Sequence, residues 1–283
     1  MVKRRRILSK LEAKFITLNM LHNKIFQKNK TVMGVVRLLP LLGYKNFPGI
    51  KKIIKVALSD IEKLEKAGFG GALVDNHTHP HVIKATSGMI ASFSTVMIEL
   101  VKKTKIPLGV QFLIDDPEAS LAIAKVSGAS FIRTDFFVDK VKTEYGIMLP
   151  RAKEIVNYKK GIFAKNVLIL ADVQVKHAKM LEKKSIAKSV KQAFSAGADA
   201  VIVTGAWTGV APEISKIIKA KKVAGIKPVI IGSGLNLQNA KELLKECNGA
   251  LVGTAVRYGS RIDFKKACNL IKEIKKGGDK YAN

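Results

Sequence analysis

Short runs of β-branched and apolar residues alternate with helical patterns from Thr31 onward, and this alternation limits the fold more than any other feature of the chain. The runs predict eight strands, at Val32–Arg37, Gly71–Asp75, Leu108–Leu113, Phe131–Thr134, Val167–Val173, Ala200–Thr204, Val229–Ile231 and Ala250–Val252. The helical patterns predict helices at Lys51–Ala67, Thr86–Lys103, Pro117–Ser127, Pro150–Lys160, Ser185–Ala196, Glu213–Val223, Leu237–Lys245 and Asp263–Lys275. Strands that alternate with helices at this spacing need right-handed parallel crossovers.

Three joints between a helix and the next strand share one pattern, in which a small residue and glycine precede a new apolar run: AGFGGALVD, SGASFIRTD and AGADAVIVTG. Glycine lies there where a helix C-cap needs positive φ. We therefore predict an α/β fold, a (β/α)8 TIM-like barrel with an N-terminal amphipathic helical extension. An open doubly wound sheet is the main alternative, and it is disfavoured because no glycine-rich dinucleotide fingerprint follows the first strand.

The length of 283 residues and the 47% hydrophobic content are enough for one barrel domain. We expect a basic amphipathic extension at residues 1–30, the barrel at 31–276 and a polar tail at 277–283. No apolar run is long enough to cross a bilayer, and no signal-peptide regions occur in order. Because two cysteines, Cys247 and Cys268, are too few for a disulfide framework, we expect a cytoplasmic protein.

The net charge of +28 raises the question of an anionic partner. Nine basic residues and a single acid, Glu12, lie in residues 1–30, and the remaining surplus is spread over nearly every predicted helix. No nucleic-acid-binding motif is present, and an aromatic content of 6% offers few stacking platforms. Dedicated nucleic-acid binding is therefore not expected, and RNA association through bulk charge is the weakest of the functional hypotheses.

The first thirty residues place apolar side chains at three- and four-residue spacings between basic ones, at Leu8, Leu11, Phe15, Leu18, Leu21 and Ile25. This pattern predicts a basic amphipathic helix. Such a helix can lie on an anionic membrane surface as a peripheral contact, or it can close the bottom of the barrel. Both interpretations stay open at this point.

The segment LADVQVKHA, residues 170–178, carries the densest group of polar residues after a predicted strand. Barrel chemistry takes place at the C-terminal ends of the strands. Period-two alternation points Asp172, Gln174 and Lys176 to one side. We take Asp172 as a candidate general base, Lys176 as an anion clamp, proton shuttle or Schiff-base nucleophile, and His177 as a proton carrier. The alternative is a surface lysine and a capping histidine after an ordinary strand.

Two later strands end alike, in PVIIGSGL and GALVGTAV. In barrels of this kind the loops after the seventh and eighth strands commonly bind phosphate through backbone N–H groups. Plain structural turns are the alternative. The predicted substrate- and phosphate-binding residues of these loops and of two other strand ends are Arg133, Thr204, Gly205, Gly232, Ser233, Gly234, Gly253 and Thr254.

The segment DNHTHPHV holds three of the five histidines. His77 and His79 form an H-x-H pair, a spacing that can place two imidazoles on one divalent metal ion. Pro80 makes the segment a turn, so solvated histidines are the alternative. No other cofactor is implied by the sequence.

Five segments, GVVRLLPLLG, FIRTD, LADVQVKHA, VTGAWTG and IGSG, together resemble the BtpA/SgcQ family over nearly all of residues 31–275. The resemblance implies a TIM-like barrel. One branch of the family is associated with photosystem I biogenesis at thylakoid membranes, and other members occur beside sugar-metabolism genes. The chain departs from the family pattern at several positions, including Arg37, where a histidine is usual, and Asp135, where an asparagine is expected.

Two main functions follow from these patterns. The first is binding, with or without conversion, of a phosphorylated sugar or nucleotide-like metabolite, by the proton-transfer or carbonyl chemistry of an aldolase, epimerase or isomerase. The second is a non-catalytic factor for the biogenesis of a membrane complex, which meets the membrane through residues 1–30. In either case we expect a homo-oligomer.

Overall fold

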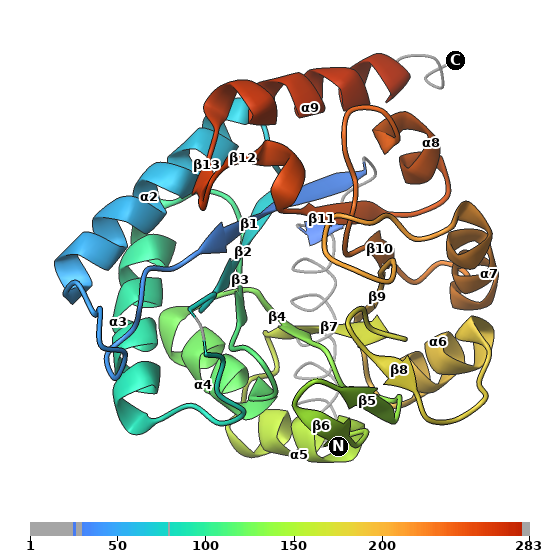
Figure 1. Ribbon diagram of the computed structural model, residues 1–283, viewed down its shortest axis with the longest axis horizontal. Coiled ribbons are helices and arrows are strands. Elements are labelled where there is room, and N and C mark those ends of the chain that lie inside the picture. The colour runs from blue at the N-terminus through green and yellow to red at the C-terminus, as the bar shows by residue number, and fades with distance from the viewer. Residues whose placement is uncertain (1–24, 27–29, 79, 279–283) are drawn as a thin grey trace, which may run out of the picture.

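The computed structural model describes residues 25, 26, 30–78 and 80–278 (Figure 1). Within these residues, parallel strands close into a barrel in the order β1-β11-β10-β9-β7-β4-β3-β2. The bounds of the barrel strands are β1 Thr31–Arg37, β2 Gly71–Asp75, β3 Leu108–Gln111, β4 Phe131–Thr134, β7 Leu168–Val173, β9 Ala200–Val203, β10 Val229–Ile231 and β11 Gly249–Val252. The predicted (β/α)8 barrel is confirmed, and the predicted strands agree with the observed ones within one or two residues at each end.

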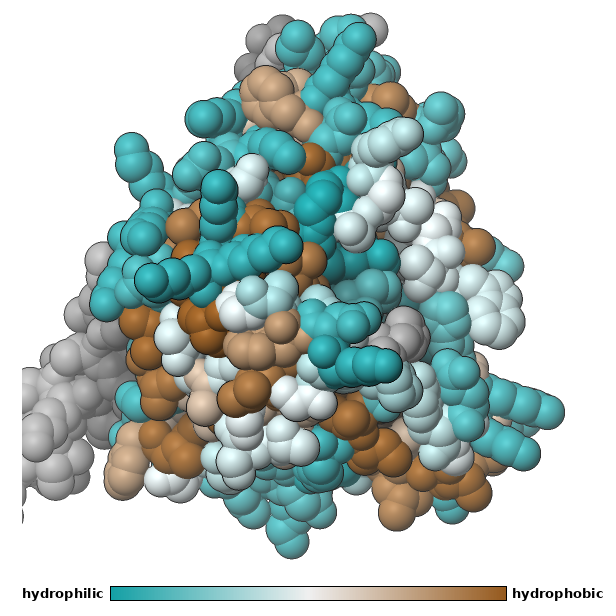
Figure 2. All heavy atoms as spheres, turned by 60° about the vertical axis from the view of Figure 1, so that its left-hand side comes forward, coloured by the Kyte–Doolittle hydropathy of each residue, from teal (hydrophilic) through white to brown (hydrophobic). Residues whose placement is uncertain are grey.

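Helices surround this barrel as an outer ring (Figure 1). Their bounds are α2 Ile50–Ala67, α3 Ser87–Lys103, α4 Pro117–Ser127, α5 Ala152–Gly161, α6 Ile186–Ser195, α7 Ile214–Ala224, α8 Ala240–Lys245 and α9 Phe264–Gly278. Each is amphipathic because one face packs on the strands and the other meets solvent. On the face drawn in Figure 2, hydrophilic and hydrophobic residues lie side by side.

The glycines of the three repeated joints have the backbone conformation that the pattern predicts. Gly68 and Gly128 follow α2 and α4 with φ of 92° and 78°, and the Gly68 N–H donates to the Glu65 and Leu64 carbonyls. Gly197 follows α6 with φ of 107°. Since this left-handed conformation favours glycine, the three residues end their helices and start the next strand.

Five short strands and one 3-10 turn were not predicted. β5 Val141–Thr143, β6 Gly146–Met148 and β8 Lys179–Met180 form an antiparallel sheet beside the mouth of the barrel, and β12 Arg257–Tyr258 pairs with β13 Arg261–Ile262. The turn η1 spans Thr254–Val256. Strands of two or three residues are too short to show a period-two pattern, so the sequence carries no signal for them.

The barrel interior is apolar toward the N-terminal ends of its strands. Its cluster of buried side chains consists of Ile25, Met33, Leu73, Phe131, Leu168, Leu170, Ala200, Ile202, Ile230 and Leu251. A Cβ atom on Gly109 would lie 2.1 Å from the Phe131 ring, so the missing side chain makes room for that ring. Further along these strands the inward positions become polar, at Arg37, Asp75, Gln111, Arg133, Asp172 and Thr204.

The predicted helix of residues 1–30 lies outside the described residues, except for Ile25, Phe26 and Lys30. Ile25 is 1% exposed inside the barrel cluster, and Phe26 packs against it. The Lys30 Nζ donates to the Cys247 carbonyl at 2.6 Å. The tail predicted at 277–283 is described only to residue 278, where α9 ends. Across the described part of the chain, no helix combines the length and the hydropathy that a membrane span requires.

Candidate functional site

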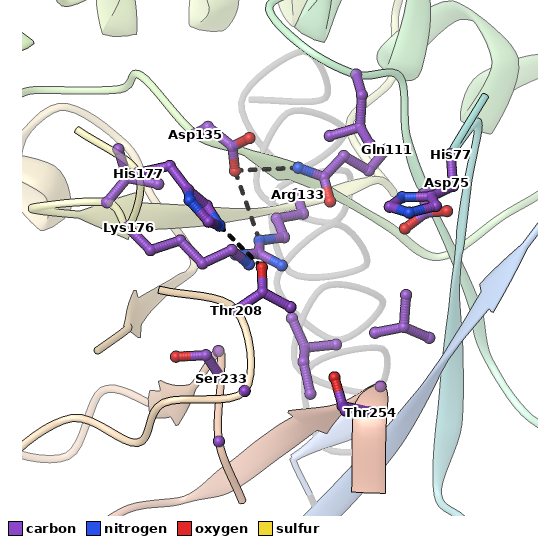
Figure 3. A pocket seen from close by; sticks show the side chains of 18 of the residues that line it. Asp75, His77, Gln111, Arg133, Asp135, Lys176, His177, Thr208, Ser233 and Thr254 are labelled. Atoms are coloured by element: carbon purple, nitrogen blue, oxygen red, sulfur yellow. Dashed lines mark hydrogen bonds and ion pairs between the residues drawn. The ribbon is translucent and has the colours of Figure 1, made fainter. Parts of the chain in front are cut away.

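A cavity of about 500 Å³ opens at the C-terminal end of the barrel, and residues from all eight barrel strands or the loops after them line it (Figure 3). Its size is in the range of small-molecule sites. Four side chains that line it carry fixed or titratable positive charge, Arg37, Arg133, Lys176 and Arg257. The acidic residues Asp75 and Asp135 line the same space, and the exposed Glu144 lines its rim.

Arg133 lines the floor of the cavity, and Asp172 lies beneath it as its partner. The Arg133 Nε donates to Asp172 Oδ1 at 2.9 Å and its Nη2 donates to Oδ2 at 2.8 Å. Burial opposes the charged guanidinium, but the Asp172 carboxylate outweighs it and raises the pKa of Arg133 above its usual value. Asp172 is 1% exposed and does not line the cavity. Its two oxygens are thus engaged in holding the arginine.

Asp135 lies near Arg133 and lines the cavity (Figure 3). Its Oδ1 accepts from the Gln111 Nε2 at 3.0 Å and lies 3.6 Å from the Arg133 Nε. Burial raises the pKa of Asp135 to about 6 although Arg133 acts in the opposite direction. A carboxyl group that titrates near 6 can both give and take a proton near neutral pH.

Asp75, at the end of β2, is the second carboxyl group of the cavity. It is 6% exposed, and no residue that the structure describes donates a hydrogen bond to its Oδ1. Burial raises the pKa of Asp75 to about 6, and the charges of Arg257 and Arg37 limit the shift. An unsatisfied buried carboxyl oxygen beside a cavity is an open position for a ligand hydroxyl group.

Arg257, the first residue of β12, lies against the loop that follows β11. Its Nη2 donates to the Val35 carbonyl, and a Cβ atom on Gly253 would lie only 3.2 Å from its Nη1. The guanidinium therefore passes directly over the Gly253 backbone. Burial, with the charge of Arg37, lowers the pKa of Arg257 to about 10, so the side chain stays charged at neutral pH.

A network behind the cavity joins the backbone of Arg37 to Arg261 and Asp60. The Arg261 Nη2 donates to the Arg37 carbonyl at 2.7 Å, and its Nη1 lies 3.1 Å from the Asp60 Oδ2. The Asp60 Oδ1 accepts from the Ile262 N–H at 3.1 Å. The β12–β13 hairpin is thereby tied to α2 and to the end of β1.

The turn after β10 contacts the loop after β9 through a side chain and through its backbone. The Ser233 hydroxyl accepts from the Gly205 N–H at 2.9 Å and donates to the Val210 carbonyl at 2.7 Å, so it ties the loop after β9 to this turn. Gly234 has φ of 72°, and a Cβ atom on it would lie 2.0 Å from the Ala211 nitrogen. The backbone N–H groups of Ser233 and Gly234 find no acceptor among the residues the structure describes.

Lys176 and His177 leave the barrel after β7 and line the cavity. The Lys176 N–H donates to the Thr204 Oγ1 at 2.9 Å, and burial with the charge of Arg133 lowers the pKa of the Lys176 ammonium group. The His177 Nε2 lies 2.9 Å from the Thr208 Oγ1, and its ring meets the Trp207 ring edge-on at 5.1 Å. Burial and the Lys176 charge lower the pKa of His177.

The histidines after β2 do not resolve the question of a metal ion. His77 lines the cavity, and its ring lies 5.8 Å from that of His81. His79, the other predicted ligand, lies outside the described residues. Among the residues that are described, no group of three His, Cys, Asp or Glu side chains is arranged to hold a metal ion. The metal site stays a prediction.

The cavity brings together most of the predicted site residues, namely Arg133, Lys176, His177, Gly232, Ser233, Gly234, Gly253, Thr254 and His77. Asp172 lies beneath it. Thr204 and Gly205 line a neighbouring hollow instead, between the β5–β8 sheet and the loop after β9. The sequence-based list of site residues missed Gln111, Arg257 and the two carboxyl groups at Asp75 and Asp135, although both acids stand at predicted strand ends.

Comparison with known proteins agrees with this architecture. A profile of the BtpA family matches residues 28–276. An uncharacterized protein of Archaeoglobus fulgidus is 34% identical over 248 residues, which cover 87% of this chain and 99% of that protein. A photosystem I biogenesis protein BtpA of Synechocystis is 30% identical over 242 residues, which cover 84% of each chain.

Solved structures of enzymes with the same barrel also resemble the chain. The (S)-3-O-geranylgeranylglyceryl phosphate synthase of Thermoplasma acidophilum, solved with its substrate sn-glycerol-1-phosphate, matches with a TM-score of 0.61 at 15% identity. The match covers 92% of this chain and 98% of the synthase. Identity this low shows the likeness of the fold alone.

Proposed function

The chain belongs to the BtpA family, and on that premise we propose that it binds the phosphate group of a small phosphorylated metabolite, a sugar phosphate or a nucleotide-like compound, in the cavity at the C-terminal end of its barrel. The observation that carries this proposal is the position of Arg257. Its guanidinium lies beside Gly253 and lines the same cavity as the turn that carries Ser233 and Gly234, whose backbone N–H groups have no acceptor in the described chain. Arginine beside exposed backbone N–H groups is a favourable setting for phosphate oxygens.

The charge balance of the cavity supports an anionic ligand. Asp172 neutralises Arg133, which leaves Arg37, Arg257 and Lys176 opposite Asp75, Asp135 and the exposed Glu144 at the rim. Because burial raises the pKa of Asp75 and Asp135 to about 6, part of their charge is lost on mild acidification while the arginines keep theirs. An excess of positive charge in a partly enclosed space attracts anions more strongly than it would in open water.

The proposed chemistry is proton transfer at a carbon or oxygen atom next to a carbonyl group, as in an aldolase, epimerase or isomerase. Asp135 is the proposed acid–base group because it lines the cavity and can change its protonation near neutral pH. Asp172 takes the role of a positioning residue that orients Arg133. His177, fixed by Thr208, is a second proton carrier at the rim.

The barrel neighbour solved with sn-glycerol-1-phosphate supports the choice of a phosphate monoester, since barrels of this kind commonly bind phosphate after their seventh and eighth strands. In this chain those strands are β10 and β11, which the two glycine turns follow. The likeness covers the fold, and the residues of the present cavity supply the chemical argument.

A charge-reversal pair tests the phosphate site. Thr254 is exposed at the cavity, and Thr95 is exposed on the distant helix α3. Inorganic phosphate and glycolaldehyde phosphate should raise the melting temperature of the wild type and of Thr95→Glu, but not of Thr254→Glu. At about a hundred times the dissociation constant, the stabilisation should reach about 2.7 kcal/mol. Equal stabilisation of all three proteins contradicts the site.

The Synechocystis relative supports a second candidate function, a factor for the biogenesis of a membrane complex. Contact with an anionic membrane would then involve the basic residues 1–24. Flotation with vesicles rich in phosphatidylserine distinguishes the full chain from a variant that lacks residues 1–24 and keeps Ile25 in the core. Equal flotation of the two proteins contradicts a membrane contact through this segment. The expected homo-oligomer stays a prediction, which sedimentation can test.

A further inference from the structure

We propose that the Lys176 side chain forms a covalent imine with the carbonyl carbon of the phosphorylated ligand, so that the substrate class is a phosphorylated aldehyde or ketone. The proposal rests on the proposed function, because the phosphate site is what brings the carbonyl group into the cavity. It assigns to this lysine a role as nucleophile, in place of an anion clamp.

The first observation is that the Lys176 ammonium group has no structural partner. It lines the cavity, yet no hydrogen bond or ion pair joins its Nζ to any residue of the described chain. Lys184, between β8 and α6, shows the opposite arrangement. Its Nζ lies 2.7 Å from Asp139 Oδ1 and donates to the Val138 carbonyl at 2.9 Å. A buried lysine that serves the fold is paired in this way, and Lys176 is not.

The second observation is the backbone that carries Lys176. Gln174 and His177 have φ values of 48° and 57°, a region that residues other than glycine and asparagine rarely adopt. The Lys176 N–H is held between them by the Thr204 hydroxyl at 2.9 Å. Figure 3 shows the side chain extending from this anchor toward the Arg133 guanidinium. Unfavourable backbone conformations that the surroundings maintain are concentrated at functional sites.

The electrostatic surroundings favour a reactive amine. Burial and the neighbouring Arg133 charge lower the pKa of Lys176, whereas Asp172, Asp135 and Asp75 act in the opposite direction. Asp172 is already paired with Arg133, and burial raises the pKa of the other two acids to about 6. A larger fraction of the amine is therefore neutral near pH 7 than for a solvated lysine, and only the neutral amine attacks a carbonyl carbon.

The step balances with groups that the cavity holds. The Nζ lone pair attacks the carbonyl carbon, and the electrons of the C=O π bond move to oxygen, which takes the proton of the Asp135 carboxyl group. The nitrogen then releases one proton to Asp135. A second protonation of the hydroxyl group lets it leave as water while the nitrogen lone pair forms the C=N bond. No oxidant, reductant or metal ion enters, and hydrolysis reverses the step.

An imine favours one of the three reaction classes named under the proposed function, which are aldolase, epimerase and isomerase. The protonated imine draws electrons from the neighbouring carbon–carbon bond, so cleavage or formation of that bond becomes accessible. The reaction class is thus a carbon–carbon lyase of the aldolase kind, with Asp135, Asp75 and, at the rim, His177 as proton carriers.

Reductive trapping tests the proposal. The full chain is incubated with glycolaldehyde phosphate or dihydroxyacetone phosphate, borohydride is added, and peptides are mapped by mass spectrometry. We expect the peptide of Lys176 to gain the mass of the probe less one oxygen atom, and excess inorganic phosphate to suppress this gain. Lys176→Arg keeps the positive charge and should lose the adduct, whereas Lys184→Arg, which preserves the structural ion pair, should keep it.

The outcomes separate the two proposals. Labelling of Lys176 no greater than that of surface lysines, in a protein that inorganic phosphate stabilises, overturns the imine and leaves the phosphate site standing. Selective labelling that inorganic phosphate does not suppress upholds the imine and removes the phosphate site. If phosphate neither stabilises the wild type nor suppresses labelling, and Lys176 is not labelled, both proposals fail.

Discussion

Arg133 and Asp172 meet through two parallel hydrogen bonds of 2.9 and 2.8 Å, from the middle of β4 to the inner face of β7, directly beneath the cavity. Both side chains are almost fully buried. A buried pair of this kind contributes little net stability compared with apolar residues, but each partner depends strongly on the other. The pair therefore fixes the position of a charge below the ligand.

The first prediction concerns the loss of one partner. Asp172→Asn keeps the shape of the side chain and removes its charge, so the buried Arg133 charge keeps only Asp135, whose Oδ1 lies 3.6 Å from its Nε. We expect the free energy of unfolding to fall by about 3 kcal/mol, the order found when a buried ion pair is broken. Urea denaturation at pH 7.5 measures the change.

Two controls accompany this measurement. The double variant Arg133→Met with Asp172→Leu removes both charges and should be more stable than Asp172→Asn. Lys103→Met breaks the exposed pair with Glu99 and should cost far less than Asp172→Asn, because solvent screens that pair. A cost for Asp172→Asn as small as that for Lys103→Met contradicts the structural role of the pair.

The second prediction follows from the pKa of Asp135, which burial raises to about 6 from about 3.9 in an unfolded chain. Between these values the folded protein holds a proton that the unfolded chain has lost, so this group makes stability fall as pH rises from about 4 to about 6. Two pKa units correspond to about 3 kcal/mol at most. Asp135→Asn should therefore match the wild type near pH 4 and exceed it in stability at pH 7.5.

Comparing the two proteins by urea denaturation at several pH values isolates this contribution from the general effect of acid on the fold. Asp75→Asn should show a gap of the same sign, because burial raises the pKa of Asp75 to about 6 as well. A difference between variant and wild type that stays constant from pH 4 to pH 7.5 contradicts the prediction.

The strands and helices of the barrel could be predicted because each carries a local signal. Gly68, Gly128 and Gly197 end helices with positive φ, and the β-branched runs after them become strands β2, β4 and β9. The two glycine turns follow β10 and β11, the seventh and eighth barrel strands, as the local patterns predicted, and both turns line the cavity. Local signals suffice wherever the residues that cooperate are neighbours in the chain.

The relationships inside the site could not be predicted, because they join residues far apart in the sequence. Period-two alternation turned Asp172 inward as predicted, but it was wrong for Gln174, because β7 ends at Val173 and Gln174 lines the neighbouring hollow. The partner of Asp172, Arg133, stands 39 residues earlier on another strand. Arg257 donates to the Val35 carbonyl 222 residues away, a contact that exists only because the closed barrel places β1 beside β11. The charge of the residues and their spacing in the sequence do not show which polar side chain is already hydrogen-bonded to another residue.

The third prediction concerns Ser233, which was expected to contact phosphate. Its hydroxyl is occupied by the Gly205 N–H and the Val210 carbonyl. Ser233→Ala leaves both groups without a partner and should lower the free energy of unfolding by about 1–3 kcal/mol. Stabilisation by inorganic phosphate should persist, because the Ser233 backbone N–H remains.

Ser215→Ala is the matched control. Its hydroxyl lies on the exposed start of α7, 3.4 Å from Glu213 Oε2, and its removal should change stability by less than about 0.5 kcal/mol. Thermal-shift titration with phosphate distinguishes the two roles of Ser233. Loss of the phosphate effect in Ser233→Ala, with stability unchanged, would show that the hydroxyl binds the ligand directly.

The fourth prediction compares two glycines with similar backbone angles. Gly209 has φ of 84° and no atom within 4 Å of a Cβ position, whereas Gly234 has φ of 72° and the Ala211 nitrogen 2.0 Å from that position. Gly209→Ala should cost about 1–2 kcal/mol, from the left-handed backbone alone. Gly234→Ala should cost a further 1–3 kcal/mol or so, because backbone atoms of the loop after β9 must move.

The movement of the loop after β9 in Gly234→Ala should also change the phosphate site. The loop after β9 carries Thr208, which holds His177, and the Ser233 hydroxyl ties it to the turn that holds Gly234. Gly234→Ala should therefore abolish stabilisation by phosphate at concentrations that saturate the wild type, while Gly209→Ala keeps it. Urea denaturation and phosphate titration of the two variants provide the test. Equal costs and equal phosphate binding would mean that the close approach of Ala211 to Gly234 does not shape the site.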